Sequence, residues 1–183
     1  MATTLELLTA EEYAKLPDTA RPTELVRGRV VEMNLPGTQH GKICNLIGRF
    51  LGNFVADHDL GNVINNDSGV ITKRNPDSVR GPDVSFYSYA RWSKGPVPDG
   101  YLPVVPEIVV EVLSPDDRWS DVHEKIAEYL NAGVSVVCVV DPKTRSAYLS
   151  YPDRPATTLA SSDDLAFPEI QADFSVPVAR LFE

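Results

Sequence analysis

The chain has 183 residues, 43% of them hydrophobic, which is enough for one domain with a substantial core. Its formal net charge of −9 argues against a protein that coats nucleic acid through a broad basic surface, although a local cationic groove is compatible with it. The N-terminus lacks the pattern of a secretion signal and no apolar segment approaches the roughly 18 residues of a membrane span, so we expect a cytoplasmic protein formed by a single domain, residues 1–183.

The first part of the chain predicts a helix, a pair of strands and a second helix. Thr9 and Glu12 have the spacing of a capping box, which predicts a short helix that ends before Pro17. The segment "ELVRGRVVEMN" predicts two short strands around a turn at Arg27 and Gly28. Apolar residues then recur at helical spacing over residues 39–57, which predicts a helix with one face packed on a sheet.

Several strands and one more helix follow. A proline- and glycine-rich segment, "WSKGPVPDGYLPVVP", predicts a loop. Gly133 is suited to end a helix. After Pro152 we expect irregular chain with one short strand near Ile170. The remaining elements are strands 69–74, 82–88 and 107–113, a helix over 120–131, and a hairpin formed by strands 134–142 and 145–151. This order predicts an α/β or α+β domain, a mixed sheet flanked by helices.

Glu111 lies in the middle of "PEIVVEVLSP", whose β-branched residues on both faces are typical of a buried strand. A lone ionised carboxylate in such a place is costly unless another group compensates it. Asp83 stands at the start of the strand in "RGPDVSFY", and if the two strands are neighbours, both carboxylates can converge on a divalent cation such as Mg²⁺. A buried ion pair would also explain Glu111, and a turn carboxylate that accepts backbone N–H groups would explain Asp83.

Lys125 lies at the border between the apolar and the polar face of the helix predicted over 120–131. Its stem can lie along the core while its ammonium group points to the sheet edge, where it could position or deprotonate a water beside a phosphate. A boundary lysine paired with Asp121 is the alternative. The apolar face is predicted to hold Val122, Ile126, Tyr129 and Leu130, and the exposed face Asp121, Glu124, Glu128 and Asn131.

Two further residues are candidates for the same site. His40 shares the inward stripe of its predicted helix, so it could contact a phosphate or a metal-bound water, or simply be a hydrogen-bonded inward histidine. Glu24, near the start of the first hairpin strand, could join the cluster or serve as a cap. The only cysteines, Cys44 and Cys138, lack the close spacing of a zinc or redox motif and are expected to be reduced core thiols.

Other chemistries find little support in the sequence. It contains no phosphate-binding glycine loop, no G-x-S-x-G and no H-E-x-x-H, and a glycosidase would lack an aromatic-rich cleft segment. Positive residues gather in two segments, Arg21, Arg27, Arg29, Lys42 and Arg49, and then Lys73, Arg74 and Arg80. These residues could form a cationic groove, or they could be scattered surface charges.

A series of segments in order resembles the Uma2 proteins, a bacterial group of restriction-endonuclease-like domains, from about Thr9 to Tyr151. The segments are "PTELVRGRVVEM…H", "GPDVSFY", "PEIVVEVLSPDD", a "D…K…Y…GV" spacing that includes Lys125, and "VVDP". This family is similar to a branch of the PD-(D/E)xK nucleases, which implies a mixed sheet flanked by helices and a Mg²⁺ site in which Mn²⁺ could substitute.

The resemblance implies a role for each candidate residue. Asp83 and Glu111 would be the metal-binding acids, and Glu24 and His40 would be auxiliary site residues. The superfamily lysine would fall at Leu113, so Lys125 would take its place from the following helix. The chain also departs from the family pattern at Arg27, where an Asp is frequent, and in "VSVVCVVDP", which lacks an aromatic pair.

The sequence thus predicts a Mg²⁺-dependent endonuclease acting on DNA. Asp83, Glu111 and the Val112 carbonyl would hold the ion, and Lys125 would orient or deprotonate the nucleophile. The alternative is an inactive nuclease-fold module that binds DNA or a protein. A homodimer is plausible because a small nuclease needs a second subunit to cut both strands. The sequence leaves open the target, the preference for DNA or RNA, the dimer interface and the biological role.

Overall fold

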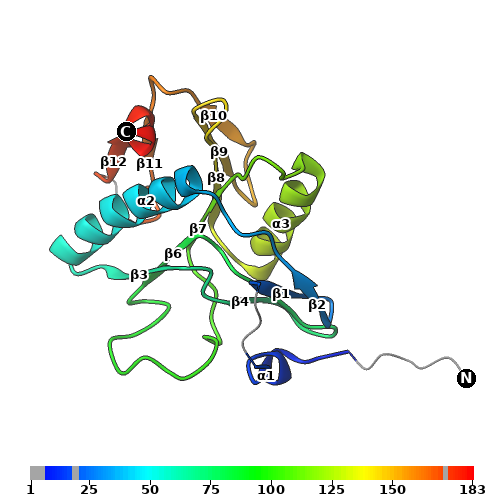
Figure 1. Ribbon diagram of the computed structural model, residues 1–183. Helices are drawn as coiled ribbons and strands as arrows, with labels where there is room; N and C mark the ends of the chain where they lie inside the picture. Colours follow the sequence, from blue (N-terminus) through cyan, green and yellow to red (C-terminus); the bar gives the residue numbers. More distant parts are fainter. Residues whose placement is uncertain (1–6, 18–20, 171–172) are drawn as a thin grey trace, which may run out of the picture.

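The computed structural model describes residues 7–17, 21–170 and 173–183 and has the predicted mixed sheet flanked by helices (Figure 1). The elements, in chain order, are α1 (Ala10–Tyr13), β1 (Thr23–Val26), β2 (Arg29–Glu32), α2 (Thr38–Asp57), β3 (Gly61–Asn65), β4 (Val70–Lys73), β5 (Ser78–Arg80), β6 (Val84–Ser88), β7 (Ile108–Val112), α3 (Trp119–Ala132), β8 (Val136–Asp141), β9 (Ser146–Ser150), β10 (Thr157–Leu159), β11 (Asp164–Ala166), β12 (Ser175–Pro177) and the 3₁₀ helix η1 (Val178–Phe182).

The central sheet has six strands in the order β10-β9-β8-β7-β6-β3. The pair β7 and β8 is parallel and joined through α3, whereas the other neighbouring pairs in this sheet are antiparallel. A parallel pair needs such a crossover, because a short turn cannot return the chain to the starting edge. β7 and β8 are buried along almost their whole length, as expected of central strands covered on both faces.

Helices cover the two faces of this sheet, α2 on one and α3 on the other (Figure 1). Residues of α2 at helical spacing, among them Ile43, Ile47 and Leu51, pack against one face together with the C-terminal elements from β11 to η1. On the other face, Val122 and Ile126 of α3 belong to a separate apolar cluster. Successive residues of β7 therefore point alternately into two different environments.

A second sheet, in the order β2-β1-β5-β4, lies beside α3. Its β1–β2 hairpin has the predicted tight turn: Arg27 and Gly28 have φ angles of 51° and 76°, and Val26 pairs with Arg29. Two consecutive residues with positive φ are typical of the two-residue turns that match strand twist. This sheet carries Glu24 on β1 and Arg80 on β5 toward the end of the central sheet.

The structure corrects the sequence prediction for the short strands. β3, β5, β10, β11 and β12 are strands that the sequence pattern did not indicate, and Ile170, near which a strand was expected, lies in a turn between β11 and β12. These strands are three to five residues long, so they form because of distant partners rather than local propensity. Within the described ranges, none of the helices has the length and apolar character that a bilayer crossing requires.

Candidate active site

Asp83 and Glu111 meet at one end of the β6–β7 pair. Val84 pairs with Val110 in antiparallel register, which places Asp83, just before β6, across from Glu111. The Asp83 carboxylate accepts a hydrogen bond from the Val112 backbone N–H, with a distance of 2.6 Å from Val112 N to Oδ2. The sequence analysis gave two interpretations of Asp83, a metal ligand or a carboxylate that accepts backbone N–H groups. Asp83 does accept a backbone N–H group, that of Val112.

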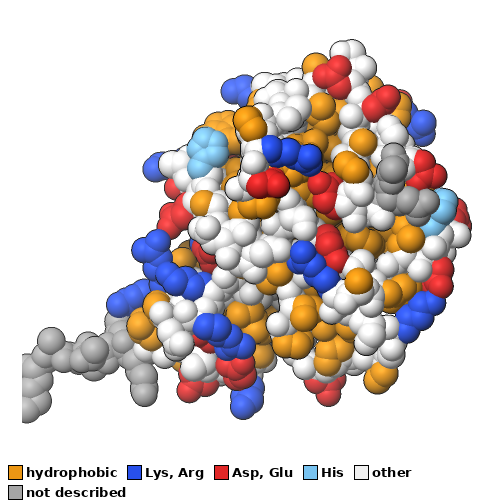
Figure 2. Space-filling model, turned by 180° about the vertical axis from the view of Figure 1, so that it is seen from behind, with side chains coloured by type: hydrophobic (Ala, Val, Ile, Leu, Met, Phe, Trp, Pro, Cys, Tyr) orange, Lys and Arg blue, Asp and Glu red, His pale blue; other side chains and the backbone are white. Residues whose placement is uncertain are grey.

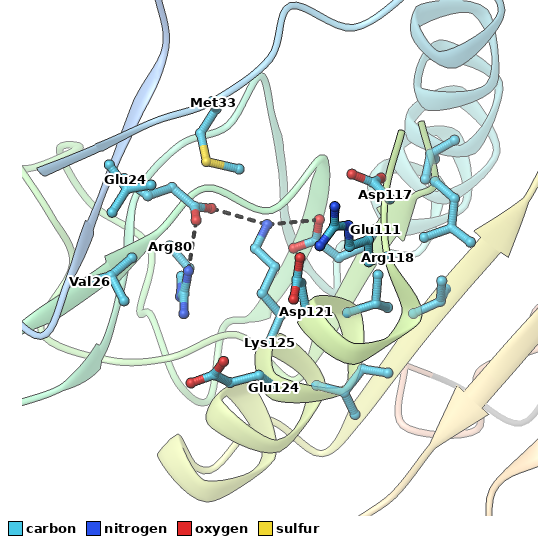
Figure 3. Close-up of a pocket in the computed structure, with 16 residues that line it drawn as sticks. Glu24, Val26, Met33, Arg80, Glu111, Asp117, Arg118, Asp121, Glu124 and Lys125 are labelled. Carbon is cyan, nitrogen blue, oxygen red and sulfur yellow. Dashed lines mark hydrogen bonds and ion pairs between the residues drawn. The ribbon is translucent and has the colours of Figure 1, made fainter. Parts of the chain in front are cut away.

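Lys125 reaches this end of the sheet from α3 and lies between two carboxylates (Figure 3). Its Nζ is 3.3 Å from Oε2 of Glu111 and 3.1 Å from Oε1 of Glu24. The sequence offered an ion pair with Asp121 as the alternative, but among the described residues Lys125 pairs with Glu111 and Glu24. The ammonium group therefore lies directly beside the Glu111 carboxylate, although Lys125 belongs to α3 and Glu111 to β7.

Burial sets the electrostatics of Glu111. It raises the pKa of this carboxyl to about 7; the positive charge of Lys125 opposes the shift, and the negative charge of Asp83 adds to it. The Tyr129 hydroxyl donates a 2.8 Å hydrogen bond to Oε1 of Glu111 and favours its ionised form. Glu111 is therefore a carboxylate whose ionisation depends on a neighbouring positive charge.

Lys125 keeps its proton in this environment. Burial alone would lower its pKa, but the charges of Glu111 and Glu24 outweigh burial and raise the pKa of Lys125 above its usual range. A protonated lysine can donate hydrogen bonds and attract negative charge, but it cannot accept a proton. The ion pairs of Lys125 with Glu24 and Glu111 thus favour an orienting role for this lysine over a role as general base.

A second layer of charged residues holds this cluster from the side of the small sheet. Arg80 Nη1 lies 2.9 Å from Oε2 of Glu24, and Nη2 lies 2.6 Å from Oε2 of Glu128. Glu128 also accepts a hydrogen bond from the Thr72 hydroxyl. The prediction that Glu128 lies on an exposed face of α3 is therefore wrong, because β4 and β5 cover that side of the helix.

His40, in the first turn of α2, contacts the cluster from the opposite face of the sheet. Its Nε2 lies 3.3 Å from Oδ1 of Asp83, and both side chains are about 90% buried, with exposed fractions of 11% and 10%. Burial opposes protonation of the imidazole, but Asp83 and a hydrogen bond to the Val112 backbone outweigh it and raise the pKa of His40. Since Val112 N already bonds to Asp83, the carbonyl is the Val112 group that faces His40.

Two cavities adjoin these residues. The first, which we call the acidic cavity, has a volume of about 210 Å³ and is lined by residues that include Glu24, His40, Asp67, Asp83, Glu111 and Lys125. The second, the lateral cavity of about 350 Å³, shares Glu24, Glu111 and Lys125 but adds apolar side chains such as Val26 and Val31 (Figure 3). A ligand could therefore approach the Lys125 ammonium from two sides.

Residues of both positively charged segments form ion pairs in the part of the chain that the structure describes. Arg80 is buried against two glutamates, Arg27 pairs with Glu124, and Arg74 pairs with Glu11 and Asp77. On the face shown in Figure 2, positive and negative side chains are interspersed. Contacts with a polyanion would therefore depend on local positive groups rather than on a broad basic surface.

All five predicted side chains, together with Val112, line the acidic cavity. The sequence analysis missed the contributions of Arg80, Asp67 and Cys44, and it assigned Tyr129 to packing only. Tyr129 stands four residues after Lys125, so their spacing on one helix face was a signal that both could reach Glu111. Arg80 gave no comparable signal, because its partners lie 56 and 48 residues away in sequence.

The donor set at the end of β6 and β7 fits a hard divalent cation. Asp83 and Glu111 supply carboxylate oxygens and Val112 a carbonyl oxygen, the ligand types that Mg²⁺ prefers. A cation at this position would compensate the burial of Glu111 and the repulsion between the two acids. The acidic cavity, with a volume of about 210 Å³, has room for water and for a phosphate oxygen beside such a cation. Lys125 lines the same cavity.

Comparisons with known proteins identify the family of the chain and a solved structure with the same fold. The model of the Uma2 family, which carries the description "Putative restriction endonuclease", matches residues 10–179 and so extends beyond the Tyr151 limit of the sequence resemblance. A crystal structure of a "putative nuclease belonging to DUF820" from Anabaena variabilis ATCC 29413 has the same fold, with a TM-score of 0.84 and 19% sequence identity. The similarity covers 96% of this chain and 97% of that one. No curated protein matches the chain significantly.

Proposed function

The chain belongs to the Uma2 family of restriction-endonuclease-like proteins, and from this premise we propose that it is a Mg²⁺-dependent endonuclease that hydrolyses DNA phosphodiester bonds. The observation that carries the proposal is the convergence of Asp83, Glu111 and the Lys125 ammonium at the end of two neighbouring strands, beside an open cavity. Paired carboxylates with an adjacent lysine are the elements that metal-dependent phosphodiester hydrolysis needs.

The metal ligands in this proposal are Asp83, Glu111 and the Val112 carbonyl. A bound Mg²⁺ supplies Lewis-acid stabilisation of the phosphate and makes a water molecule more acidic. The protein's part is to present the oxygens in a fixed arrangement. The hydrogen bond from Val112 N orients Asp83, and the Tyr129 hydroxyl orients Glu111.

Lys125 acts in this proposal as a hydrogen-bond donor and a positive charge. Its Nζ, held 3.1 Å from Glu24 and 3.3 Å from Glu111, can orient the attacking water and attract the negative charge that develops on the phosphate. Glu24 is fixed in turn by Arg80 and by the Gly81 backbone N–H, with distances of 2.9 and 3.0 Å. Glu24 therefore positions Lys125 and is a positioning residue.

His40 has a related auxiliary role. Its Nε2 contacts Asp83 and its ring faces the Val112 carbonyl, so it fixes two of the three ligands at once. This arrangement corresponds to the outer hydrogen bonds that orient metal-binding carboxylates in other proteins. We also propose that two copies of the chain act together on duplex DNA, one centre for each strand.

The proposal is tested by incubating supercoiled, linear and single-stranded DNA with the protein and Mg²⁺ or Mn²⁺. Metal-dependent nicking is expected, and Asp83→Asn should reduce it by about 10²-fold or more, because one ligand oxygen and its charge are lost. Asp164→Asn, an exposed acid on β11, is the matched control and should cleave normally. Equal activity of Asp83→Asn and the unaltered protein would refute the assignment of the site.

The second candidate function is a module that uses the same fold to bind DNA or a protein without cleavage. It is favoured by Leu113, which occupies the superfamily lysine position, and by the engagement of Lys125 with two carboxylates. A calorimetric Mg²⁺ titration separates the two functions. Binding that disappears in Asp83→Asn and Glu111→Gln supports the nuclease, whereas no ion binding that depends on these acids supports the module.

A further inference from the structure

His40, Cys44 and Asp83 form a second group of potential metal ligands on the α2 side of the sheet. One donor atom from each residue lies within 4.8 Å of the other two. The Cys44 sulfur is 3.4 Å from Nδ1 of His40, and Nε2 of His40 is 3.3 Å from Oδ1 of Asp83. The proposed Mg²⁺ site uses Asp83 but has no need of the thiol.

The spacing of these atoms suits a small tetrahedral ion. Zn²⁺ binds imidazole nitrogen at about 2.0–2.1 Å and thiolate sulfur at about 2.3 Å, which places the two donors about 3.6 Å apart in a tetrahedral site. The separation between Cys44 Sγ and His40 Nδ1 is 3.4 Å. His40 and Cys44 stand one helical turn apart on α2, so the helix itself maintains this spacing.

The chemistry of the donors separates this group from the oxygen site. Sulfur and imidazole ligands favour Zn²⁺ or Co²⁺, whereas Mg²⁺ prefers oxygen. Cys44 is a partly buried free thiol, and it would bind the cation as a thiolate. His40 and Asp83 both line the acidic cavity, through which an ion and a fourth ligand, water, could enter.

We propose that His40, Cys44 and Asp83 bind a borderline divalent cation such as Zn²⁺, with water in the fourth position. On binding, Cys44 loses its proton to solvent and the sulfur becomes a ligand. The ion binds one ring nitrogen of His40 and replaces the contact that this nitrogen makes without it, with Cys44 at Nδ1 or with Asp83 at Nε2.

The shared ligand gives this site a regulatory consequence, which rests on the proposed nuclease function. The two sites share Asp83 as a ligand, and two divalent cations bound so close together would repel each other. Zn²⁺ should therefore compete with Mg²⁺ and inhibit cleavage. The binding experiment below does not depend on cleavage, so the zinc site can be tested even if the protein proves to have no nuclease activity.

Co²⁺ is the probe for this site, because a thiolate ligand adds a sulfur-to-cobalt charge-transfer band in the near ultraviolet that oxygen ligands lack. The full-length protein should show this band at one equivalent of Co²⁺, and Zn²⁺ should abolish it by displacement. Cys44→Ser should lose the band. Because the sequence has only two cysteines, Cys138→Ser is the complete control and should retain it.

Two further variants make the result specific. His40→Gln should weaken Co²⁺ binding at least about tenfold, whereas Glu111→Gln should leave the band in place because Glu111 is not a ligand of this ion. Circular dichroism of each variant checks that it is folded. Co²⁺ binding without the charge-transfer band, or a band that persists in Cys44→Ser, would overturn the proposal, and so would an unchanged affinity in folded His40→Gln.

Discussion

The two faces of β7 show how one strand can serve two purposes. On the α2 side, Ile108, Val110 and Val112 are buried among apolar side chains. On the α3 side, Val109 is followed by Glu111, which contacts Lys125 and Tyr129. The first face gains stability from burial alone, whereas the second contains a carboxylate whose burial is unfavourable without a positive partner.

This difference indicates which interactions exist for folding and which for chemistry. An apolar residue at position 111 would pack against Val122 and Ile126 as Val109 does, at no electrostatic cost. The chain instead has Glu111 there, in contact with Lys125 and Tyr129. The ion pair between Arg80 and Glu24 lies next to these residues. Such a preformed polar environment, next to an open cavity, is typical of a site that binds and transforms a charged ligand.

Lys125→Met is expected to have one of the largest effects on the α3 side. The apolar side chain keeps the packing of the stem but removes the charge beside the phosphate, so Mg²⁺-dependent cleavage should fall by about 10³-fold, equivalent to about 4 kcal/mol in the transition state. Lys125→Arg, which keeps the charge, should recover part of the rate. Normal rates in folded Lys125→Met would show that this lysine has no part in the reaction.

Arg80→Met tests how strongly the surrounding charges support the site. Arg80 is 10% exposed and pairs with Glu24 and Glu128, so its loss leaves two buried carboxylates without their partner and should lower the free energy of unfolding by about 3 kcal/mol. Chemical denaturation measures the change. Arg74→Met is the matched control: this side chain is 47% exposed, and its loss should have a much smaller effect. Equal effects in the two variants would contradict the importance of burial.

Val110→Ala tests the opposite, apolar face of β7. Val110 is fully buried, and removal of two methyl groups should lower the free energy of unfolding by about 2–3 kcal/mol. The rate of cleavage per folded molecule should not change, because the side chain points away from Lys125. The comparison between the two faces would fail if this variant lost activity while remaining fully folded.

The smallest expected effect is the pH dependence that Glu111 confers in metal-free buffer. Its pKa is about 7 in the folded protein, because burial raises it from its usual value near 4.5, so between these values the folded state binds more protons than the unfolded state. Stability should therefore fall as pH rises, by about 2 kcal/mol between about pH 5 and pH 7 from this group alone.

Unfolding of the protein and of Glu111→Gln at several pH values with EDTA measures this contribution. The variant lacks the titrating group, so the difference in stability between variant and protein should shift in the variant's favour as pH rises. A difference that stays constant with pH would show that Glu111 titrates near its usual pKa.

The sequence predicted the elements with strong local signals. The period of α2, the continuous apolar runs of β7 and β8 and the Arg27-Gly28 turn all have local causes, and each is where it was expected. β5 and β11 could not be predicted, because three-residue strands depend on partners that lie elsewhere in the chain.

The same distinction applies to the site. Glu111 was noticeable because an acid in an apolar strand violates local pattern, and Asp83 because of its place at a strand start. Their convergence required the pairing of β6 and β7, which the sequence allowed but did not establish. Arg80 and Cys44 have ordinary local surroundings, so their contacts with Glu24 and His40 became visible only in three dimensions.

The most direct test of the central claim compares the two faces of β7 in one assay, cleavage of supercoiled DNA with Mg²⁺ by the protein, Glu111→Gln and Val110→Ala. We expect Glu111→Gln to remain folded and to lose cleavage by about 10³-fold or more, while Val110→Ala is less stable but cleaves normally when folded. Undiminished cleavage by folded Glu111→Gln would contradict the assignment of this carboxylate as a metal ligand.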